Sequence, residues 1–368
     1  MSNCISKIHI KSYRGIQDLY LDNLKKINIL TGDNNSGKTS VLEVISSFSS
    51  PADFRKWRTL LRIENPNPYK RGTTIYEGFY DLFNIDFDSK NIDYTIEANK
   101  TEFHTVMSAF EVEEEMTMKE YYHIIGFSTN KKDEQSFETV IVPKLELQID
   151  INEEVVNSAS IYDGQYRLPV PLNKSLKKYE AKIIYISPTR HAEGELFLSQ
   201  VLDRPDLYEE MINVLRDYDE DIMSINYDFH EHRNMGRGVY KILSKTHQKA
   251  LPLNVYGDGM KKAVLLMSAV IAAQDGILLL DEFETAIHTS AMDKTFAWIL
   301  KTCLKLNVQL FLTSHSEEAI NKVLKCVPSL QNDIAVYTLY KDEQGNSVRR
   351  LSGNKAIEVQ DEMGLELR

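Results

Sequence analysis

The sequence has few cysteines, and it lacks both a membrane-length apolar run and an apolar leader. Its three cysteines, Cys4, Cys303 and Cys326, lie far apart and show no paired spacing of metal ligands. This argues for reduced thiols rather than a disulfide framework or a zinc site. No apolar stretch approaches the roughly eighteen residues of a membrane-spanning helix, and the first residues lack the basic lead of a secretory signal. We therefore expect a cytoplasmic protein without membrane contact.

A surplus of positive charge is also missing, since the 368 residues carry a formal net charge of −11. Any contact with nucleic acid must therefore come from a local patch or from a partner. One basic patch surrounds Trp57 and consists of Arg55, Lys56, Arg58, Arg62, Lys70 and Arg71. It is interpreted either as a solvated helix edge or as a surface for DNA or a partner. The polar segment with His230, His232 and Arg233 is either a surface loop or a metal cluster.

The most specific motif is Gly32 to Thr39, which reads G-x-x-x-x-G-K-T. It follows the apolar run 27–31 and precedes the helical pattern 41–45, which is the strand, loop and helix context that a phosphate loop requires. Two glycines let backbone N–H groups converge on a phosphate, Lys38 supplies a mobile cation, and the Thr39 hydroxyl is suited to bind Mg²⁺. The motif predicts nucleoside triphosphate binding through Asn34, Asn35, Ser36, Gly37, Lys38, Thr39 and Ser40.

Alternating and helical patterns predict the arrangement of the chain. Strands are expected at 5–10 and 19–24, and the alternation of Ile92, Tyr94 and Ile96, repeated over 144–151, predicts a lobe of half-buried antiparallel strands up to about residue 180. A buried strand follows at 182–186, and helical spacing runs from Leu207 to Ile222. We expect a core of residues 1–50 and 250–368, with an inserted β-rich and helical lobe at 51–250.

The last third of the chain alternates strand and helix. Apolar runs at 277–280 and 308–313 predict strands buried on both faces, separated by helical patterns at 260–273, 292–303 and 317–325, with a further strand at 335–340. This order predicts an α/β fold with a parallel sheet, right-handed crossovers and ligands at the carboxyl ends of the strands. Lys38, Asp281, Glu282 and His315 all lie at such ends.

These strand ends carry the expected chemistry. Asp281 is the natural partner of the magnesium held by Thr39, and Glu282 is placed to orient or deprotonate the attacking water. The alternative for this pair is a cap at a helix start. His315 is expected to donate to the γ-phosphate and sense its loss, although alone it would be an ordinary core histidine. Arg14, in the first tight connection, either reaches the phosphates or forms a surface pair.

The phosphate loop with Asn34, the pair Asp281–Glu282 and the segment Thr313–Ser316 resemble the ABC-type ATPase heads of the RecF, SMC, Rad50 and OLD group. Within it, the chain is most similar to compact bacterial AAA15 or OLD-like ATPases over residues 1–50 and 250–340. The resemblance implies a P-loop ABC-type head, ATP and Mg²⁺ as cofactors, and phosphate contact by Arg14. Gly257, Asp258 and Gly259 stand where that group has its signature, with glycine in place of the signature serine.

In that group, the signature helix of one subunit caps the γ-phosphate bound by another. The resemblance therefore implies a homodimer, or a higher oligomer of dimers, that forms with ATP and hydrolyses it slowly. It also implies a separately encoded effector, Toprim-like as in PARIS-type phage-defence modules, because the chain ends at Arg368 with no room for such a domain. The alternatives are a RecF-like DNA-repair ATPase and a scaffold that binds ATP without hydrolysis. A transporter subunit is disfavoured because phosphate loop and signature lie 257 − 32 = 225 positions apart.

Overall fold

A six-stranded sheet forms the centre of the molecule. The computed structural model describes residues 4–63, 73–84, 90–126, 138–168, 180–188, 196–228, 239–285, 287, 289–342 and 345–363. The order of the central sheet is β15-β14-β3-β13-β12-β8. All neighbours run parallel except β15, which pairs antiparallel with β14 at one edge. The strands are β3 (Ile27–Thr31), β8 (Ile183–Ile186), β12 (Ile277–Leu280), β13 (Gln309–Thr313), β14 (Ile334–Asp342) and β15 (Gly345–Ser352).

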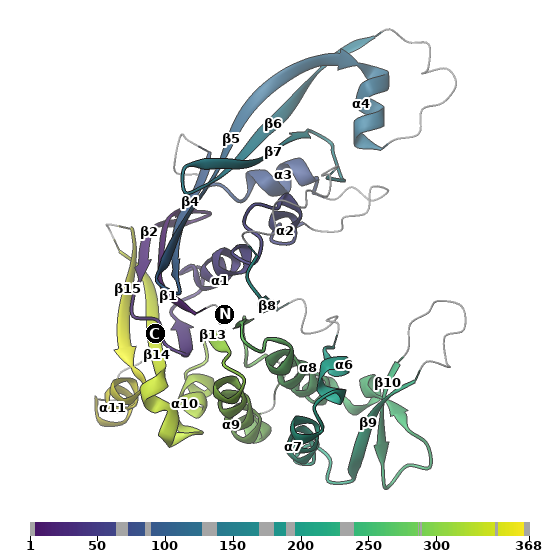
Figure 1. Cartoon of the computed structure of the whole chain (residues 1–368), viewed down its shortest axis with the longest axis vertical. Helices are drawn as coiled ribbons and strands as arrows, with labels where there is room; N and C mark the ends of the chain where they lie inside the picture. Colours follow the sequence, from purple (N-terminus) through teal and green to yellow (C-terminus); the bar gives the residue numbers. More distant parts are fainter. Residues whose placement is uncertain are drawn as a thin grey trace.

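The central strands are covered on both faces, which explains their uninterrupted apolar sequences. Every residue of β3, β12 and β13 is buried. Leu278 and Leu280 face a core shared with the helices on one side, whereas Ile277 and Leu279 face a second core on the other side. Figure 1 shows the first face covered by α8 (Asp258–Ala272), α9 (Thr289–Lys305) and α10 (Glu317–Lys325). The opposite face is covered by α1 (Lys38–Ser47) and the second sheet.

The second sheet is antiparallel, with the order β2-β1-β4-β5-β6-β7. In β4 the burial alternates residue by residue, as the sequence pattern predicts. The long strands β5 and β6 extend away from the core and end at α4 (Met118–Ile125), where they form an arm (Figure 1). The strands are β1 (Ile5–Tyr13), β2 (Ile16–Leu21), β4 (Asn91–Ala98), β5 (Thr101–Thr117), β6 (Thr139–Ile151) and β7 (Glu154–Tyr162).

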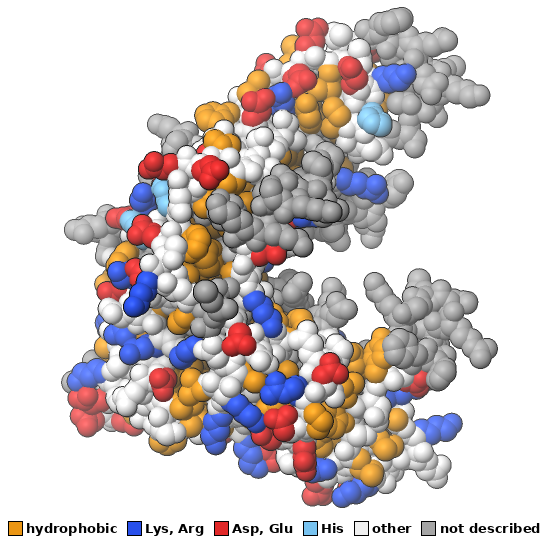
Figure 2. Space-filling model, viewed as in Figure 1, with side chains coloured by type: hydrophobic (Ala, Val, Ile, Leu, Met, Phe, Trp, Pro, Cys, Tyr) orange, Lys and Arg blue, Asp and Glu red, His pale blue; other side chains and the backbone are white. Residues whose placement is uncertain are grey.

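The remaining elements complete the two ends of the molecule. Strands β9 (Ile222–Asp228), β10 (Val239–Ser244) and β11 (Leu251–Pro252) form a small antiparallel sheet. Figure 2 shows a wide recess on one side, between the arm and the lobe that contains this sheet. The other helices are α2 (Phe54–Arg58), α3 (Ile75–Tyr80), α6 (Leu198–Leu202), α7 (Pro205–Leu215), α11 (Gly353–Met363) and the short η4 (Leu253–Tyr256) and η5 (Pro328–Asp333). Among the described helices, none combines the length and apolarity needed to cross a membrane.

Several element boundaries differ from the sequence prediction, and two of these differences have a clear local cause. The helical spacing from Leu207 to Ile222 is wrong at its end, because α7 stops at Leu215 and Ile222 begins β9. Ile222 is fully buried in the same core as α7, so its apolar character imitates another helical turn. Strand β2 ends at Leu21 rather than Leu24, since Asn23 has a φ of 51° and breaks the extended backbone.

The division into a core at 1–50 and 250–368 and an insertion at 51–250 stays a prediction. The hydrogen-bonded sheets do not follow this division in sequence. Strand β8 pairs with β12 of the central sheet although it lies within 51–250. Strand β1 pairs with β4 and thus joins the first residues to the antiparallel sheet. The antiparallel sheet thus contains strands from both parts of the predicted division.

Candidate functional site

The backbone between β3 and α1 is shaped to receive an anion. Gly32 has a φ of 134°, and a Cβ there would collide with the backbone carbonyl of Leu339. Gly37 has a φ of 99° and precedes α1, whose N-terminus has no side-chain cap. Uncapped N–H groups at a helix start, in a loop curled by two glycines, form a phosphate-binding nest.

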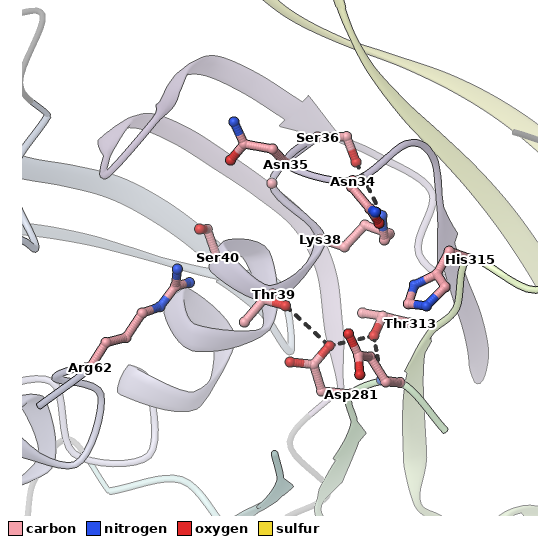
Figure 3. A pocket seen from close by; sticks show the side chains of 12 residues that line it. Asn34, Asn35, Ser36, Lys38, Thr39, Ser40, Arg62, Asp281, Thr313 and His315 are labelled. Atoms are coloured by element: carbon pink, nitrogen blue, oxygen red, sulfur yellow. Dashed lines mark hydrogen bonds between the residues drawn. The ribbon is translucent and has the colours of Figure 1, made fainter. Parts of the chain in front are cut away.

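A cavity of about 250 Å³ lies over this loop, at the carboxyl ends of β3, β12 and β13 (Figure 3). The sequence predicted every residue of its lining except Arg62 and Thr313 as part of the nucleotide site. The residues that line it are Asn34, Asn35, Ser36, Gly37, Lys38, Thr39, Ser40, Arg62, Asp281, Glu282, Thr313 and His315. The fold therefore brings the loop together with Asp281, Glu282 and His315, although Asp281 follows Thr39 by 242 positions in the chain.

The Lys38 ammonium folds back onto its own loop. Its Nζ donates to the carbonyl oxygens of Gly32 and Asp33, each at 2.7 Å. Burial lowers the pKa of Lys38 from its ordinary value, and the nearby carboxylates of Asp281 and Asp33 oppose this effect. A bound triphosphate would replace these carbonyls with phosphate oxygens, which are stronger partners of a buried cation.

Asp281 is held by three hydroxyl groups from three elements. Its Oδ1 lies 3.3 Å from Thr39 Oγ1 and 2.5 Å from Thr313 Oγ1 (Figure 3), while Tyr185 of β8 donates to Oδ2 at 3.1 Å. The Asp281 side chain is almost completely buried, with 1% of the residue exposed. Burial raises the pKa of Tyr185, and the Asp281 carboxylate adds to that rise. These contacts fix the carboxylate directly beneath Thr39.

The Thr39 hydroxyl and the Asp281 carboxylate are chemically suited to bind Mg²⁺. Both are oxygen donors, which Mg²⁺ prefers, and their oxygens already lie within one hydrogen-bond length of each other. The phosphate nest lies at the same edge, and Mg²⁺ in such sites is shared between one or two protein oxygens and the phosphates. Bound there, the ion would neutralise charge on the phosphate oxygens.

Glu282 occupies a strained turn immediately after β12. It has a φ of 49°, in the left-handed region that residues other than glycine rarely adopt. Its N–H donates to Thr313 Oγ1 at 2.8 Å. Residues of this turn are thus tied to β13, and strain of this kind persists where surrounding contacts enforce it.

His315 is exposed and lines the cavity, so it is not a core histidine. Its ring lies on the same side of the cavity as Asp281 and Thr313 (Figure 3). Glu284 holds the segment that carries His315. Its Oε1 accepts from Ser314 Oγ at 2.8 Å and from the His315 N–H at 3.4 Å. Glu284 therefore connects the turn after β12 to the segment after β13, a contact that sequence reasoning did not identify.

Arg14 does not line the cavity and instead forms a buried pair. Its Nε donates to Glu43 of α1 at 3.0 Å, and its other nitrogens donate to the carbonyls of Leu60 and Asp81. Both side chains of the Arg14–Glu43 pair are at most 10% exposed. In this structure Arg14 thus forms the ion pair that was the alternative to phosphate contact, although the pair is internal rather than at the surface.

Arg62, unlike Arg14, is one of the residues that line the cavity. Figure 3 shows it on the far side of Thr39 and Ser40 from His315. Its guanidinium also contacts Glu43 Oε1 at 3.3 Å, but its side chain is 55% exposed. The sequence named Arg62 only as part of a basic patch, because nothing in a linear pattern shows that the segment after α2 returns to α1.

Two described residues of the basic patch, Arg55 and Lys56, are engaged within the protein. Arg55 pairs with Asp53 at 2.6 Å, Lys56 donates to Ser46, and Trp57 is fully buried. These contacts favour the helix-edge interpretation for the described part of the patch. Lys70 and Arg71 lie outside the described residues, as do His230, His232 and Arg233 of the candidate metal cluster.

The signature-like segment lies away from the cavity of its own chain. Gly257, which the sequence places at the position of the signature serine, precedes α8 with a φ of 85°, a conformation that favours glycine. Gly257 and Asp258 are exposed and Gly259 is half-buried, and none of these three residues lines the cavity. The structure therefore separates the signature-like segment from the phosphate loop within one chain.

Comparisons with known proteins agree with this geometry. A family model described as "AAA domain, putative AbiEii toxin, Type IV TA system" matches residues 27–321. An "ATP/GTP phosphatase" from Helicobacter pylori is 22% identical over 338 residues, which cover 86% of each chain. Among solved structures, the SMC head bound to the C-terminal winged-helix domain of ScpA matches with a TM-score of 0.51 and 11% identity, over 96% of this chain and 99% of that one.

An SMC head with an extended coiled coil, bound to the C-terminal domain of ScpA from Pyrococcus furiosus, matches with a TM-score of 0.50 and 10% identity over 99% of this chain and 100% of that one. At such low identity the likeness concerns the fold, and it confirms the predicted ATPase-head architecture. The family model covers the phosphate loop, the turn after β12 and the segment after β13. The chain therefore belongs to this AAA-domain family and is an ATPase with the fold of an SMC head.

Proposed function

We propose that the chain binds ATP with Mg²⁺, associates with a second copy in the bound state, and hydrolyses the γ-phosphate slowly. The observation that carries this proposal is that the phosphate loop and the N-terminus of α8 lie apart within one chain. One chain supplies the phosphate loop, Asp281 and Glu282 to the cavity, while the N-terminus of α8, with Gly257 and Asp258 exposed, lies outside it. A helix N-terminus favours anions, so α8 of one copy is suited to meet the γ-phosphate held by another.

Within this proposal each residue of the cavity has a defined role. Lys38 and the loop N–H groups bind the β- and γ-phosphates, and Thr39 with Asp281 holds the metal ion. Glu282 orients or deprotonates the attacking water, while His315 contacts the γ-phosphate. Arg62 adds a second cation, replacing Arg14 in the role that the sequence assigned to it. The relative named "ATP/GTP phosphatase" supports triphosphate hydrolysis and makes GTP the first competitor to test.

A mixed-subunit experiment tests whether two copies share one site. Lys38→Ala removes the phosphate cation, and Gly259→Glu places a negative charge in the first turn of α8, where an acidic residue does not disturb the helix. Each variant alone should lose ATP turnover. Their mixture should regain it, because a mixed dimer combines an intact loop with an intact helix. If Gly259→Glu keeps full activity alone, the site is complete within one chain and the sandwich is wrong.

We further propose that this ATP-dependent association controls a separately encoded effector in anti-phage defence. Support comes from the OLD-like motifs and from a family description that includes a toxin–antitoxin system. Two of the solved heads that are similar to this chain were bound to another protein, ScpA. Phage challenge of cells carrying the native operon, compared with Glu282→Gln and with deletion of each neighbouring gene, tests this role. Equal plaque numbers in all strains would contradict it.

A RecF-like DNA-binding ATPase and a scaffold without hydrolysis remain the competing proposals. Binding of the purified protein to duplex DNA, measured at several salt concentrations, tests the first, and single-turnover phosphate release tests the second. The ion pair of Arg55 with Asp53 leaves less free positive charge than the sequence alone indicates. For that reason effector control is preferred to direct DNA binding.

A further inference from the structure

Helix α8 carries a buried lysine one turn after its N-terminus. Lys262 is 1% exposed, a degree of burial that lysine rarely has without partners. Burial lowers the pKa of Lys262 to about 7, while the carboxylates of Glu284 and Glu282 act in the opposite direction. Removing a lysine ammonium from water costs free energy, so its burial at this position requires a structural or functional explanation.

The ammonium reaches from α8 into the turn that follows β12. Its Nζ donates to the carbonyl oxygens of Thr285 and Glu282, the latter at 3.4 Å. These carbonyls belong to a turn in which Thr285 N–H also donates to Glu282 O at 3.0 Å. Lys262 thus satisfies backbone acceptors at both ends of the turn 282–285.

Glu282 is therefore fixed through both of its peptide groups. Its N–H is accepted by Thr313 of β13, and its carbonyl accepts from Lys262 of α8. Its φ of 49° is unfavourable for a residue with a Cβ, and it is maintained by such contacts. Because side-chain direction follows from backbone conformation, these two contacts help to set the direction of the Glu282 carboxylate, which lines the cavity.

We propose that Lys262 is a positioning residue that holds the Glu282 turn in its active conformation from within helix α8. This inference rests on the proposed role of Glu282 in activating water. Lys262 itself does not line the cavity, so it acts on the reaction only through Glu282. Its removal should slow the hydrolysis step and leave nucleotide binding unchanged.

The test uses two variants at position 262 and one control. Lys262→Met keeps the length of the side chain and removes the donor, whereas Lys262→Gln retains a neutral donor. Lys301→Met changes an exposed lysine on α9 in the same way. In single-turnover hydrolysis we expect Lys262→Met to be about 10- to 100-fold slower than wild type, in the range seen for misplaced catalytic groups. Lys262→Gln should recover part of the rate, and Lys301→Met should match wild type.

Nucleotide affinity and a double-mutant cycle distinguish positioning from general damage to the fold. Binding of a fluorescent ATP analogue should change less than about threefold in Lys262→Met, because Lys38 and Thr39 are untouched. In a Glu282→Gln background, Lys262→Met should cause no further loss, since both substitutions act on the same step. Equal slowing in both backgrounds, or a wild-type rate in Lys262→Met, would overturn the inference.

The outcome also separates this inference from the proposed function. If Glu282→Gln slows hydrolysis and Lys262→Met does not, only the role of Lys262 fails. If Glu282→Gln has a wild-type rate, the assignment of Glu282 fails and the role of Lys262 fails with it. Should Lys262→Met not fold, Lys262→Gln with the same cycle decides the question, because it retains a hydrogen-bond donor.

Discussion

The hydroxyl of Thr313 donates to Asp281 at 2.5 Å and accepts the backbone N–H of Glu282 at 2.8 Å. One side chain from the end of β13 therefore contacts both neighbouring residues at the end of β12, Asp281 through its carboxylate and Glu282 through its backbone. Parallel pairing of β12 with β13 places Leu280 opposite Leu312, which brings Thr313 level with Asp281. The register of two buried strands thus sets the geometry of the proposed metal ligand and the proposed base.

Replacing Thr313 with valine should remove both contacts. Valine has the same shape but neither donates to Asp281 nor accepts from Glu282, and an unsatisfied buried group costs about 1 to 3 kcal/mol. We expect the unfolding free energy to fall by that amount and steady-state ATP turnover to fall at least about tenfold. Urea unfolding and phosphate release measure the two effects. Thr302→Val, at a buried threonine on α9, is the control and should leave turnover per folded molecule unchanged.

Arg62 and Arg14 share Glu43 but should respond differently to alanine substitution. Arg62 is half exposed and lines the cavity, so Arg62→Ala should weaken ATP affinity by about tenfold with little change in stability. Arg14→Ala leaves the buried Glu43 without its main partner and should cost about 3 to 5 kcal/mol of unfolding free energy. Calorimetric titration and urea unfolding check both. Reversal of the two outcomes would return phosphate contact to Arg14.

Removal of the metal should expose the roles of Thr39 and Asp281. With excess EDTA we expect ATP affinity to fall and hydrolysis to stop, because the charge of the phosphates is no longer neutralised. Thr39→Ala should raise the Mg²⁺ concentration needed for half-maximal turnover by about tenfold, the loss expected for one oxygen ligand. Thr59→Ala, at an exposed threonine, is the control. An unchanged Mg²⁺ requirement in Thr39→Ala would contradict the assignment.

Lys262 should make stability depend on pH above neutrality. Its pKa is about 7 in the folded protein and near its ordinary value of 10.5 in the unfolded chain. Between these values the unfolded chain binds more protons, so the contribution of Lys262 to the unfolding free energy rises with pH, whereas below pH 7 the full cost of burying the charge remains. In urea unfolding, the unfolding free energy of wild type should therefore rise relative to that of Lys262→Met between about pH 6.5 and about pH 9. Parallel pH curves for the two proteins would show that Lys262 is charged throughout.

Local patterns predicted much of the fold and most of the cavity lining. The phosphate loop is specified by its own short motif, and the all-apolar strands before Asp281 and Thr313 indicate a buried parallel sheet whose ends must meet. The pattern could not place Arg62 in the cavity or bring Tyr185 to Asp281, since both depend on register and chain path. The contact of Glu284 could not be predicted for the same reason, because its partners, the Ser314 hydroxyl and the His315 N–H, follow a different strand.

The differences from the sequence expectation also have physical causes. Arg14 is a candidate for phosphate contact in the sequence because a cation in a tight turn has no visible partner there, whereas the fold places Glu43 of α1 beside it. Ile222 fits a helical spacing because burial, not periodicity, determines its apolar character. Both cases reflect tertiary contacts that a one-dimensional pattern does not contain.

Helix α8 joins two regions that sequence separates. Its N-terminal end exposes Gly257 and Asp258, and its next turn carries Lys262, whose amino group donates to the Glu282 carbonyl. From Met260 onward nearly every residue is buried, so α8 is packed along almost its whole length. Helix α8 would then act in both the proposed association of two copies and the proposed hydrolysis of ATP. An inhibitor that immobilises α8 would block both.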